Sequence, residues 1–154
     1  MVALSFARVT DEQAARSWQQ VHNEIIPTAP LTLDEVVARS TPYVLDLARL
    51  DEQVVGCSTV RPAADSDPVT VIVRVLPPFR RQGLGAAFLA HAVTHARELE
   101  ADRIQTIVLA SNTDGLEFAL RRGFVETDRY LLDGDTVAYI HLATSLDDLV
   151  QRLP

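Results

Sequence analysis

An apolar strand meets a helix at Val75-Leu76-Pro77-Pro78-Phe79-Arg80-Arg81-Gln82-Gly83-Leu84-Gly85-Ala86, a basic turn that carries two glycines. The residues before the turn, Val69 to Val75, are mostly β-branched and are bounded by Pro68 and Pro77, as is typical of a strand. The residues after it, Gly83 to Leu99, carry a helical apolar stripe. The first N–H groups of a helix have no intrahelical partner, and the helix dipole favours anions. The turn therefore predicts a site for a diphosphate.

The spacing of the turn separates it from other phosphate loops. No Gly-Lys-Ser/Thr follows, and Phe88 stands where a dinucleotide loop has its third glycine. Instead, Arg80 to Gly85 behind Val75 and Pro77 resembles the acyl-CoA loop of the GNAT acetyltransferase superfamily, Arg/Gln-x-x-Gly-x-Gly/Ala after Val-x-Pro. A second segment, Asn112 to Phe124, is similar to that superfamily's Asn-led helix ending in Gly-Phe.

Composition limits the other possibilities. The chain has 154 residues, 47% of them hydrophobic, which predicts a single domain over residues 1–154. Its net charge of −7 argues against nucleic-acid or membrane-surface binding and favours a cationic acceptor such as an amine. The single cysteine, Cys57, excludes an internal disulfide and a cysteine metal cluster. Without a signal-peptide pattern or a bilayer-length apolar run, we expect a cytoplasmic protein.

The remaining residues predict elements in the order β-α-α-β-β-β-α-β-α-β-β. The expected strands are Ala3–Val9, Tyr43–Leu50, Gln53–Val60, Val69–Val75, Ile104–Ala110, Val125–Leu132 and Thr136–Leu142. Helices are expected from capping boxes at Thr10 and Thr32, over Gly83–Leu99 and Thr113–Arg122, and over Leu146–Leu153. This order agrees with a GNAT-like α/β (mixed α+β) fold, which implies a central mixed, twisted sheet of about seven strands. Two central parallel strands splay apart, and four or five helices pack on both faces.

The resemblance implies how acetyl-CoA would be held. Its pantetheine arm would enter between the splayed strands like an added strand, while the diphosphate lies on the helix N-terminus. The expected cofactor-binding residues are Val73, Arg74, Val75, Arg80, Arg81, Gln82, Gly83, Leu84, Gly85, Ala86 and Asn112. The implied reaction is direct acetyl transfer to a primary amine, in a small molecule or a peptide, within a ternary complex.

The proton-transfer groups depart from the superfamily pattern. A tyrosine commonly stands seven residues after the asparagine, where this chain has Ala119, and Val69 replaces a common carboxylate in the central strand. A thiol with a pKa near 8.5, about that of free cysteine, can leave as a thiolate without strong acid help. Replacement catalysts are expected from the acceptor side: Glu24 as base through water, Tyr130 as acid, with Tyr139 and His141 as further candidates.

Other residues receive plainer interpretations. His91 and His95 are four residues apart, as in some zinc sites, but Ala92 replaces the catalytic glutamate, so we expect partly exposed surface histidines and no metal. Cys57 is expected to be a buried, inert thiol and Trp18 a core residue. A homodimer is possible through the edge of the last hairpin. Two alternatives to an enzyme stay open: a catalytically degenerate CoA-binding or sensing module, and an interaction domain.

Overall fold

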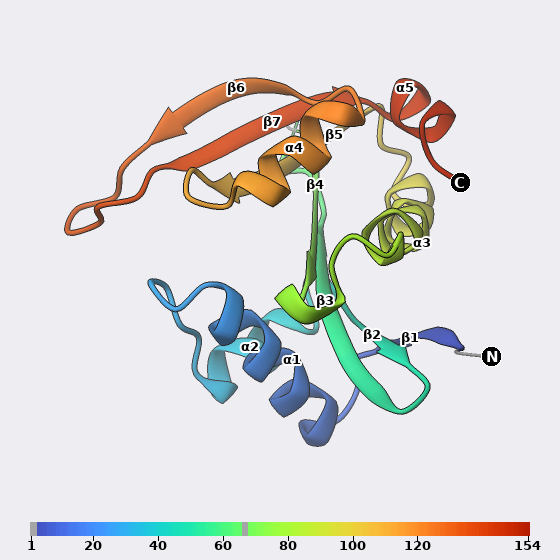
Figure 1. Ribbon diagram of the computed structural model, residues 1–154, viewed down its shortest axis with the longest axis vertical. Helices are drawn as coiled ribbons and strands as arrows, with labels where there is room; N and C mark the ends of the chain where they lie inside the picture. Colours follow the sequence, from blue (N-terminus) through green and yellow to red (C-terminus); the bar gives the residue numbers. More distant parts are fainter. Residues whose placement is uncertain (1–2, 66–67) are drawn as a thin grey trace.

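The computed structural model describes residues 3–65 and 68–154, so Met1, Val2, Ser66 and Asp67 lie outside the described residues. Its strands form one mixed sheet in the order β1-β2-β3-β4-β5-β7-β6 (Figure 1). The strands are β1 (Leu4–Arg8), β2 (Val44–Leu50), β3 (Gln53–Arg61), β4 (Val69–Val75), β5 (Arg103–Leu109), β6 (Val125–Tyr130) and β7 (Tyr139–Ser145). Every neighbouring pair is antiparallel except β4 and β5, which are parallel.

Helices cover both faces of the sheet. They are α1 (Glu12–Ile25), α2 (Leu33–Arg39), α3 (Leu84–Glu98), α4 (Thr113–Arg121) and α5 (Leu146–Gln151), with a short 3₁₀ turn, η1, over Pro77–Phe79. On one face, α1 and α2 bury Trp18 and Val36 against β2 and β3 (Figure 1). On the other face, α3 buries Leu89 and Ala92 against β4, β5 and β7. The two apolar clusters therefore fix the sheet between helices, as the predicted fold class requires.

The parallel strands separate soon after they meet. β4 and β5 pair only at Val69 with Ile104 and at Thr70 with Gln105, where the Gln105 side-chain amide also donates to the Thr70 hydroxyl at 3.2 Å. Beyond this point β4 pairs only with β3 and β5 only with β7. The inner edges of the two strands are consequently left facing one another across a gap, which confirms the predicted splay.

Most helix boundaries follow the sequence signals, with one correction. Thr32 caps α2 in a full capping box with Glu35, as predicted. For α1, however, the N-cap is Asp11 rather than Thr10, because the Asp11 carboxylate accepts a hydrogen bond of 2.7 Å from the Ala14 N–H. A carboxylate one residue later satisfies an unpaired N–H of the first turn and adds a favourable charge at the helix N-terminus.

The last hairpin also differs from its prediction. β7 begins at Tyr139 and continues to Ser145, three residues beyond the predicted strand over Thr136–Leu142. The reason is tertiary, because Ala143 and Thr144 are buried where β7 pairs with β5. β6 ends at Tyr130, and the predicted strand residues Leu131 and Leu132 are exposed in the connection.

Candidate functional site

The N-terminus of α3 is left open by its sequence. Gly83 is the N-cap, with φ of +81° and no side chain to satisfy the helix donors. The first intrahelical bond runs from the Ala87 N–H to the Gly83 carbonyl at 3.2 Å. The N–H groups of Leu84, Gly85 and Ala86 thus have no intrahelical partner and can bind an anion.

The two glycines of the turn serve different purposes. A Cβ at Gly83 would meet nothing within 4 Å, so glycine is favoured there by the left-handed backbone rather than by space. A Cβ at Gly85 would lie 3.0 Å from Phe118 of α4. Gly85 therefore allows α3 and α4 to approach closely beside the open N–H groups.

The two arginines of the turn are held in place by neighbouring groups. The Arg80 Nε donates to the Val75 carbonyl at 2.8 Å, so this side chain lies against the end of β4. Arg81 has φ of +66°, and its guanidinium pairs with Asp114 at 3.1 Å and Glu117 at 3.2 Å on α4, which raises its pKa. Exposed ion pairs of this kind contribute little free energy, so a diphosphate can compete with them.

A cavity of about 290 Å³ joins this turn to the splay between β4 and β5. Nine of the eleven predicted cofactor-binding residues line it: Val73, Arg74, Val75, Arg80, Arg81, Gly83, Gly85, Ala86 and Asn112. The other two lie elsewhere in the turn. Gln82 is exposed, with its amide 3.5 Å from the Pro78 carbonyl, and the Leu84 side chain packs against a cluster that includes Phe88.

The inner edge of β4 supplies main-chain groups to this cavity. The Leu76 N–H donates to the Val55 carbonyl of β3 at 2.8 Å. Along an antiparallel pair, residues alternate between facing the partner strand and facing away from it. Val75 and Val73 therefore direct their N–H and C=O groups away from β3, toward the gap.

Asn112 has a structural task in addition to its place in the cavity. It is the N-cap of α4, and its side-chain oxygen accepts from the Gly115 N–H at 2.9 Å. A Cβ at Gly115 would lie 2.6 Å from the Asn112 amide nitrogen, so the cap depends on that glycine. Asn112, the asparagine of the second motif, therefore stabilises the start of α4.

The candidate catalysts lie in three different settings. Tyr139 lines the cavity, and burial, followed by the Asp135 and Tyr130 charges, raises its pKa. The Tyr130 hydroxyl is 2.9 Å from the His141 Nε2, and its ring stacks on Tyr139 at 5.8 Å, so it reaches the cavity only through these neighbours. Glu24 is exposed near the end of α1 and does not line the cavity. Ala119, at the usual acid position, is buried and lines the cavity with no polar side chain.

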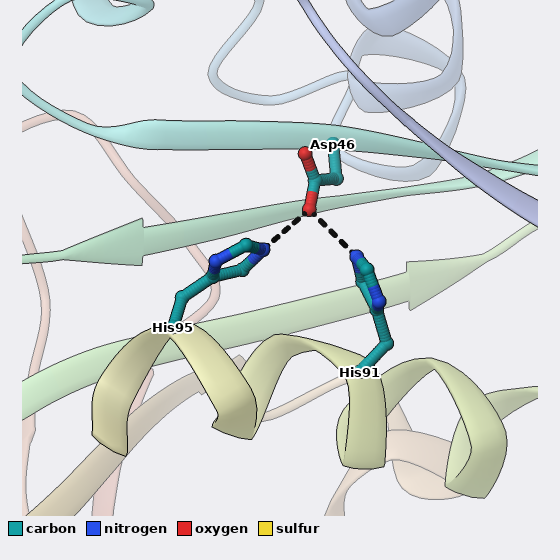
Figure 2. Close-up of side chains that lie close together, drawn as sticks. All are labelled: Asp46, His91 and His95. Carbon is teal, nitrogen blue, oxygen red and sulfur yellow. Dashed lines mark hydrogen bonds and ion pairs between the residues drawn. The ribbon is translucent and has the colours of Figure 1, made fainter. Parts of the chain in front are cut away.

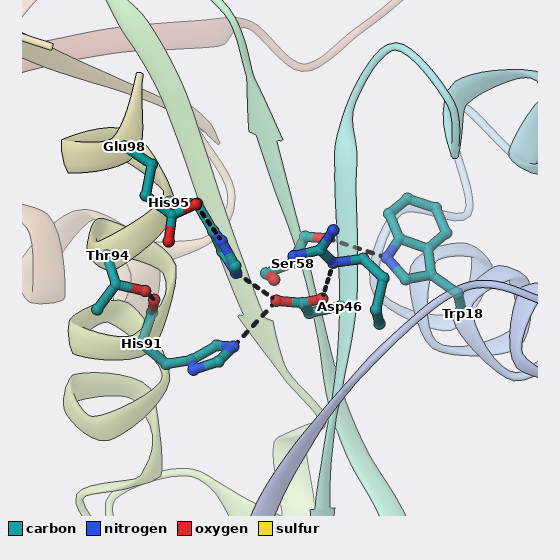
Figure 3. Close-up of polar contacts among 8 residues, drawn as sticks. Trp18, Asp46, Ser58, His91, Thr94, His95 and Glu98 are labelled. Atoms are coloured by element: carbon teal, nitrogen blue, oxygen red, sulfur yellow. Dashed lines mark hydrogen bonds and ion pairs between the residues drawn. The ribbon is translucent and has the colours of Figure 1, made fainter. Parts of the chain in front are cut away.

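A separate polar cluster joins α3 to β2 on the side of the α3 helix away from the cavity residues. The Nε2 atoms of His91 and His95 each lie 3.0 Å from the same oxygen of Asp46, which is nearly fully buried (Figure 2). The Arg8 Nε donates to the other Asp46 oxygen at 2.9 Å. In Figure 3 the cluster lies beside Ser58, whose carbonyl accepts from the Trp18 indole at 3.0 Å.

Both histidines are partly exposed, as predicted, but sequence reasoning missed their carboxylate partner. Asp46 precedes them by 45 and 49 residues, so no local spacing links the three. The only sequence signal was a lone acid in the apolar run Val44–Leu50. Because Arg8 also pairs with the carboxylate, both Asp46 oxygens are bonded and the network ties α3 to the sheet, although the buried His95 Nδ1 has no hydrogen-bond partner in the described part of the chain.

A mixed sheet with two splayed parallel strands, next to an open helix N-terminus, is the arrangement that the resemblance of the two motifs implied. Residues 9–124 match the sequence family described as the Acetyltransferase (GNAT) family, and the chain belongs to that family. The family and fold expected from the two motifs are thus confirmed.

The chain is also similar to individual known proteins. Mycothiol acetyltransferases from two Mycobacterium strains, JLS and MCS, are 31% identical to it over 100 residues, which are 62% of this chain and 33% of theirs. The chain thus spans about a third of the length of these curated relatives. Among solved structures, Ard1 from Thermoplasma volcanium has a TM-score of 0.76 at 17% identity and covers 94% of this chain and 98% of its own. The Salmonella typhimurium protein yncA, solved with acetyl-CoA, has a TM-score of 0.73 at 17% identity; the match covers 96% of this chain and 95% of yncA.

Within the described residues, no helix combines the length and the apolar character that crossing a membrane requires.

Proposed function

We propose that the chain transfers an acetyl group from acetyl-CoA to a primary amine by direct attack in a ternary complex. One observation carries the proposal: a single cavity is lined both by Gly85 and Ala86, with their open N–H groups at the start of α3, and by the inner edge of β4, which has no partner strand beyond Thr70. The first set suits a diphosphate and the second suits the two amides of pantetheine. The residues present therefore fit the co-substrate.

The chain's own groups would divide the work of the reaction. The N–H groups of Leu84, Gly85 and Ala86 bind the diphosphate, with Arg80 adding charge. An inward-facing β4 N–H at Val75 stabilises the oxyanion that forms when the amine attacks the thioester carbonyl. Tyr139, the candidate acid that lines the cavity, donates a proton to the departing thiolate, and its raised pKa keeps it protonated at neutral pH. The Tyr130 ring stacks on the Tyr139 ring and holds Tyr139 in this orientation. Glu24 would act as base only through water.

The test is an assay of CoA release with a panel of primary amines, paired with mass spectrometry of the acetylated product. A thiol reagent can follow CoA, because the only cysteine, Cys57, is buried. We expect amine-dependent thiol release with one product per thiol. Tyr139→Phe should lower kcat at saturating acetyl-CoA more than it changes KM.

A sensing module is the second candidate, favoured by Ala119 and Val69 at the two usual proton-transfer positions. It predicts that CoA stabilises the fold while no amine accelerates thiol release. An interaction domain without a ligand predicts no thermal shift with CoA at all.

A further inference from the structure

Arg74 is a charged side chain near the end of the apolar strand β4. It lies directly opposite Cys57 in the β3–β4 register, so the two side chains share the face of the sheet that α1 and α2 cover. On the opposite face, Val71 packs against α3. Arg74 also lines the cavity, together with Ile25 and Ile26 at the end of α1. Arg74 therefore lies on the α1 side of the gap between β4 and β5, where the proposed function needs the amine acceptor to enter.

Among residues 3–65 and 68–154, the Arg74 guanidinium forms no ion pair with a carboxylate. Its pKa is lowered, first by burial and further by the positive charges of Arg39 and Arg61. The groups that oppose this effect are Cys57 and Tyr139. Neither is ionised at neutral pH, because burial raises the pKa of the Cys57 thiol to about 12 and also raises that of Tyr139.

The surroundings of Arg74 add positive charge instead of neutralising it. Arg61 lies 5.4 Å from the centre of the Tyr43 ring, and its Nε is buried without a hydrogen-bond partner in the described part of the chain. The pKa of the neighbouring His22 is lowered mainly by burial, with further contributions from Arg74 and Arg39. This local excess of positive charge stands in a protein whose net charge is −7.

The Arg74 side chain is half-buried at the cavity wall, and a guanidinium in such a place is normally paired with a carboxylate. Its planar fork matches a carboxylate with two parallel hydrogen bonds. We infer that Arg74 is an anion-binding subsite, and that the acceptor is a small molecule carrying a carboxylate beside its primary amine, as an amino acid does. Arg39 and Arg61 attract the same carboxylate from farther away. The inference rests on the proposed acetyl transfer and specifies its substrate class.

The experiment compares matched acceptors that differ in the carboxylate alone, such as amino acids and their amides. The kcat/KM values are corrected for the fraction of free amine at the assay pH. Even one hydrogen bond to a charged group predicts that wild-type enzyme prefers the carboxylate member by about 10- to 100-fold. In R74Q this ratio should fall toward one, and R74K should keep part of it. R97Q, at the exposed end of α3, is the matched control and should keep the full ratio. Aminophosphonates, run as a third arm, distinguish a general oxoanion site from one shaped for a carboxylate.

The outcomes separate this inference from the proposed function. Equal ratios in wild type and R74Q overturn the subsite while acetyl transfer stands. CoA binding without turnover of any amine overturns acetyl transfer and the subsite with it. Thermal melting without ligand shows whether each Arg74 variant is folded. R74M should melt no lower than wild type, since it removes a charge that has no counter-ion, whereas a large drop would show that Arg74 has a structural partner and would contradict the inference.

Discussion

Replacing Arg80 with methionine tests whether the turn before α3 binds a diphosphate. The Arg80 guanidinium is about three-quarters buried and is oriented by the 2.8 Å bond from its Nε to the Val75 carbonyl. That bond leaves the terminal amino groups of the guanidinium free to reach a phosphate oxygen, which need only compete with the partly exposed ion pair of Arg80 with Asp114 at 3.8 Å. A hydrogen bond to a charged group contributes about 1.5–3 kcal/mol, and each 1.4 kcal/mol is a factor of ten. R80M should therefore weaken CoA binding by roughly 10- to 100-fold.

The assay is calorimetric titration with CoA and, separately, with pantetheine, which lacks the diphosphate. R80M should weaken CoA binding and leave pantetheine binding within about twofold of wild type. Loss of the bond to Val75 also costs about 0.5–1.5 kcal/mol of folding stability, so melting is measured beside binding. R97M, at the exposed C-terminal end of α3, controls for the loss of one positive charge. Unchanged CoA affinity in R80M, or equal loss for both ligands, would refute the assignment of the turn.

The remaining predictions concern stability and titration. Asn112→Ala should lose about 1 kcal/mol of unfolding free energy and melt about 2–4 °C lower, whereas Asn112→Ser keeps the cap; equal melting of the two variants would contradict the capping role. Burial lowers the pKa of His22 below 6.5, so the stability that depends on neutral His22 is complete above pH 6.5 and is lost as the pH falls below it. In urea unfolding, His22→Gln should therefore lose less stability between pH 7.5 and 5 than wild type. An identical loss would disprove this. Cys57 should react with a thiol reagent only at the rate of unfolding, and fast labelling of the folded protein would show that the thiol is accessible. Excess zinc should not raise the melting temperature, because Arg8 and both histidines already bond the two carboxylate oxygens of Asp46. A rise in melting temperature that His95→Gln abolishes would instead reveal a metal site.

Cap residues in the sequence predicted where two helices near the site begin. The open end of α3 follows from a glycine N-cap, and the start of α2 follows from the Thr32 capping box. The family resemblance, rather than periodicity, predicted the splay between β4 and β5. This feature depends on where pairing stops after Thr70 and Gln105, which no single-strand pattern encodes.

Features that depend on distant contacts could not be predicted in the same way. The partnership of Asp46 with His91 and His95 spans more than forty residues and appears only when β2 packs beneath α3. Likewise, the sequence marks Arg74 as a charge within an apolar strand, but whether a carboxylate accompanies it is decided by the surrounding elements. The start of β7 was misplaced because its pairing with β5, not its own alternation, sets the strand.

Hydrogen exchange of the backbone amides with and without acetyl-CoA is the most direct measurement of the central claim, that one cavity holds the whole co-substrate. The account predicts new protection at Leu84, Gly85 and Ala86 and along the inner edge of β4 at Val73 and Val75, with β1 and β2 unchanged. Protection confined to other segments, or none at saturating acetyl-CoA, would contradict it.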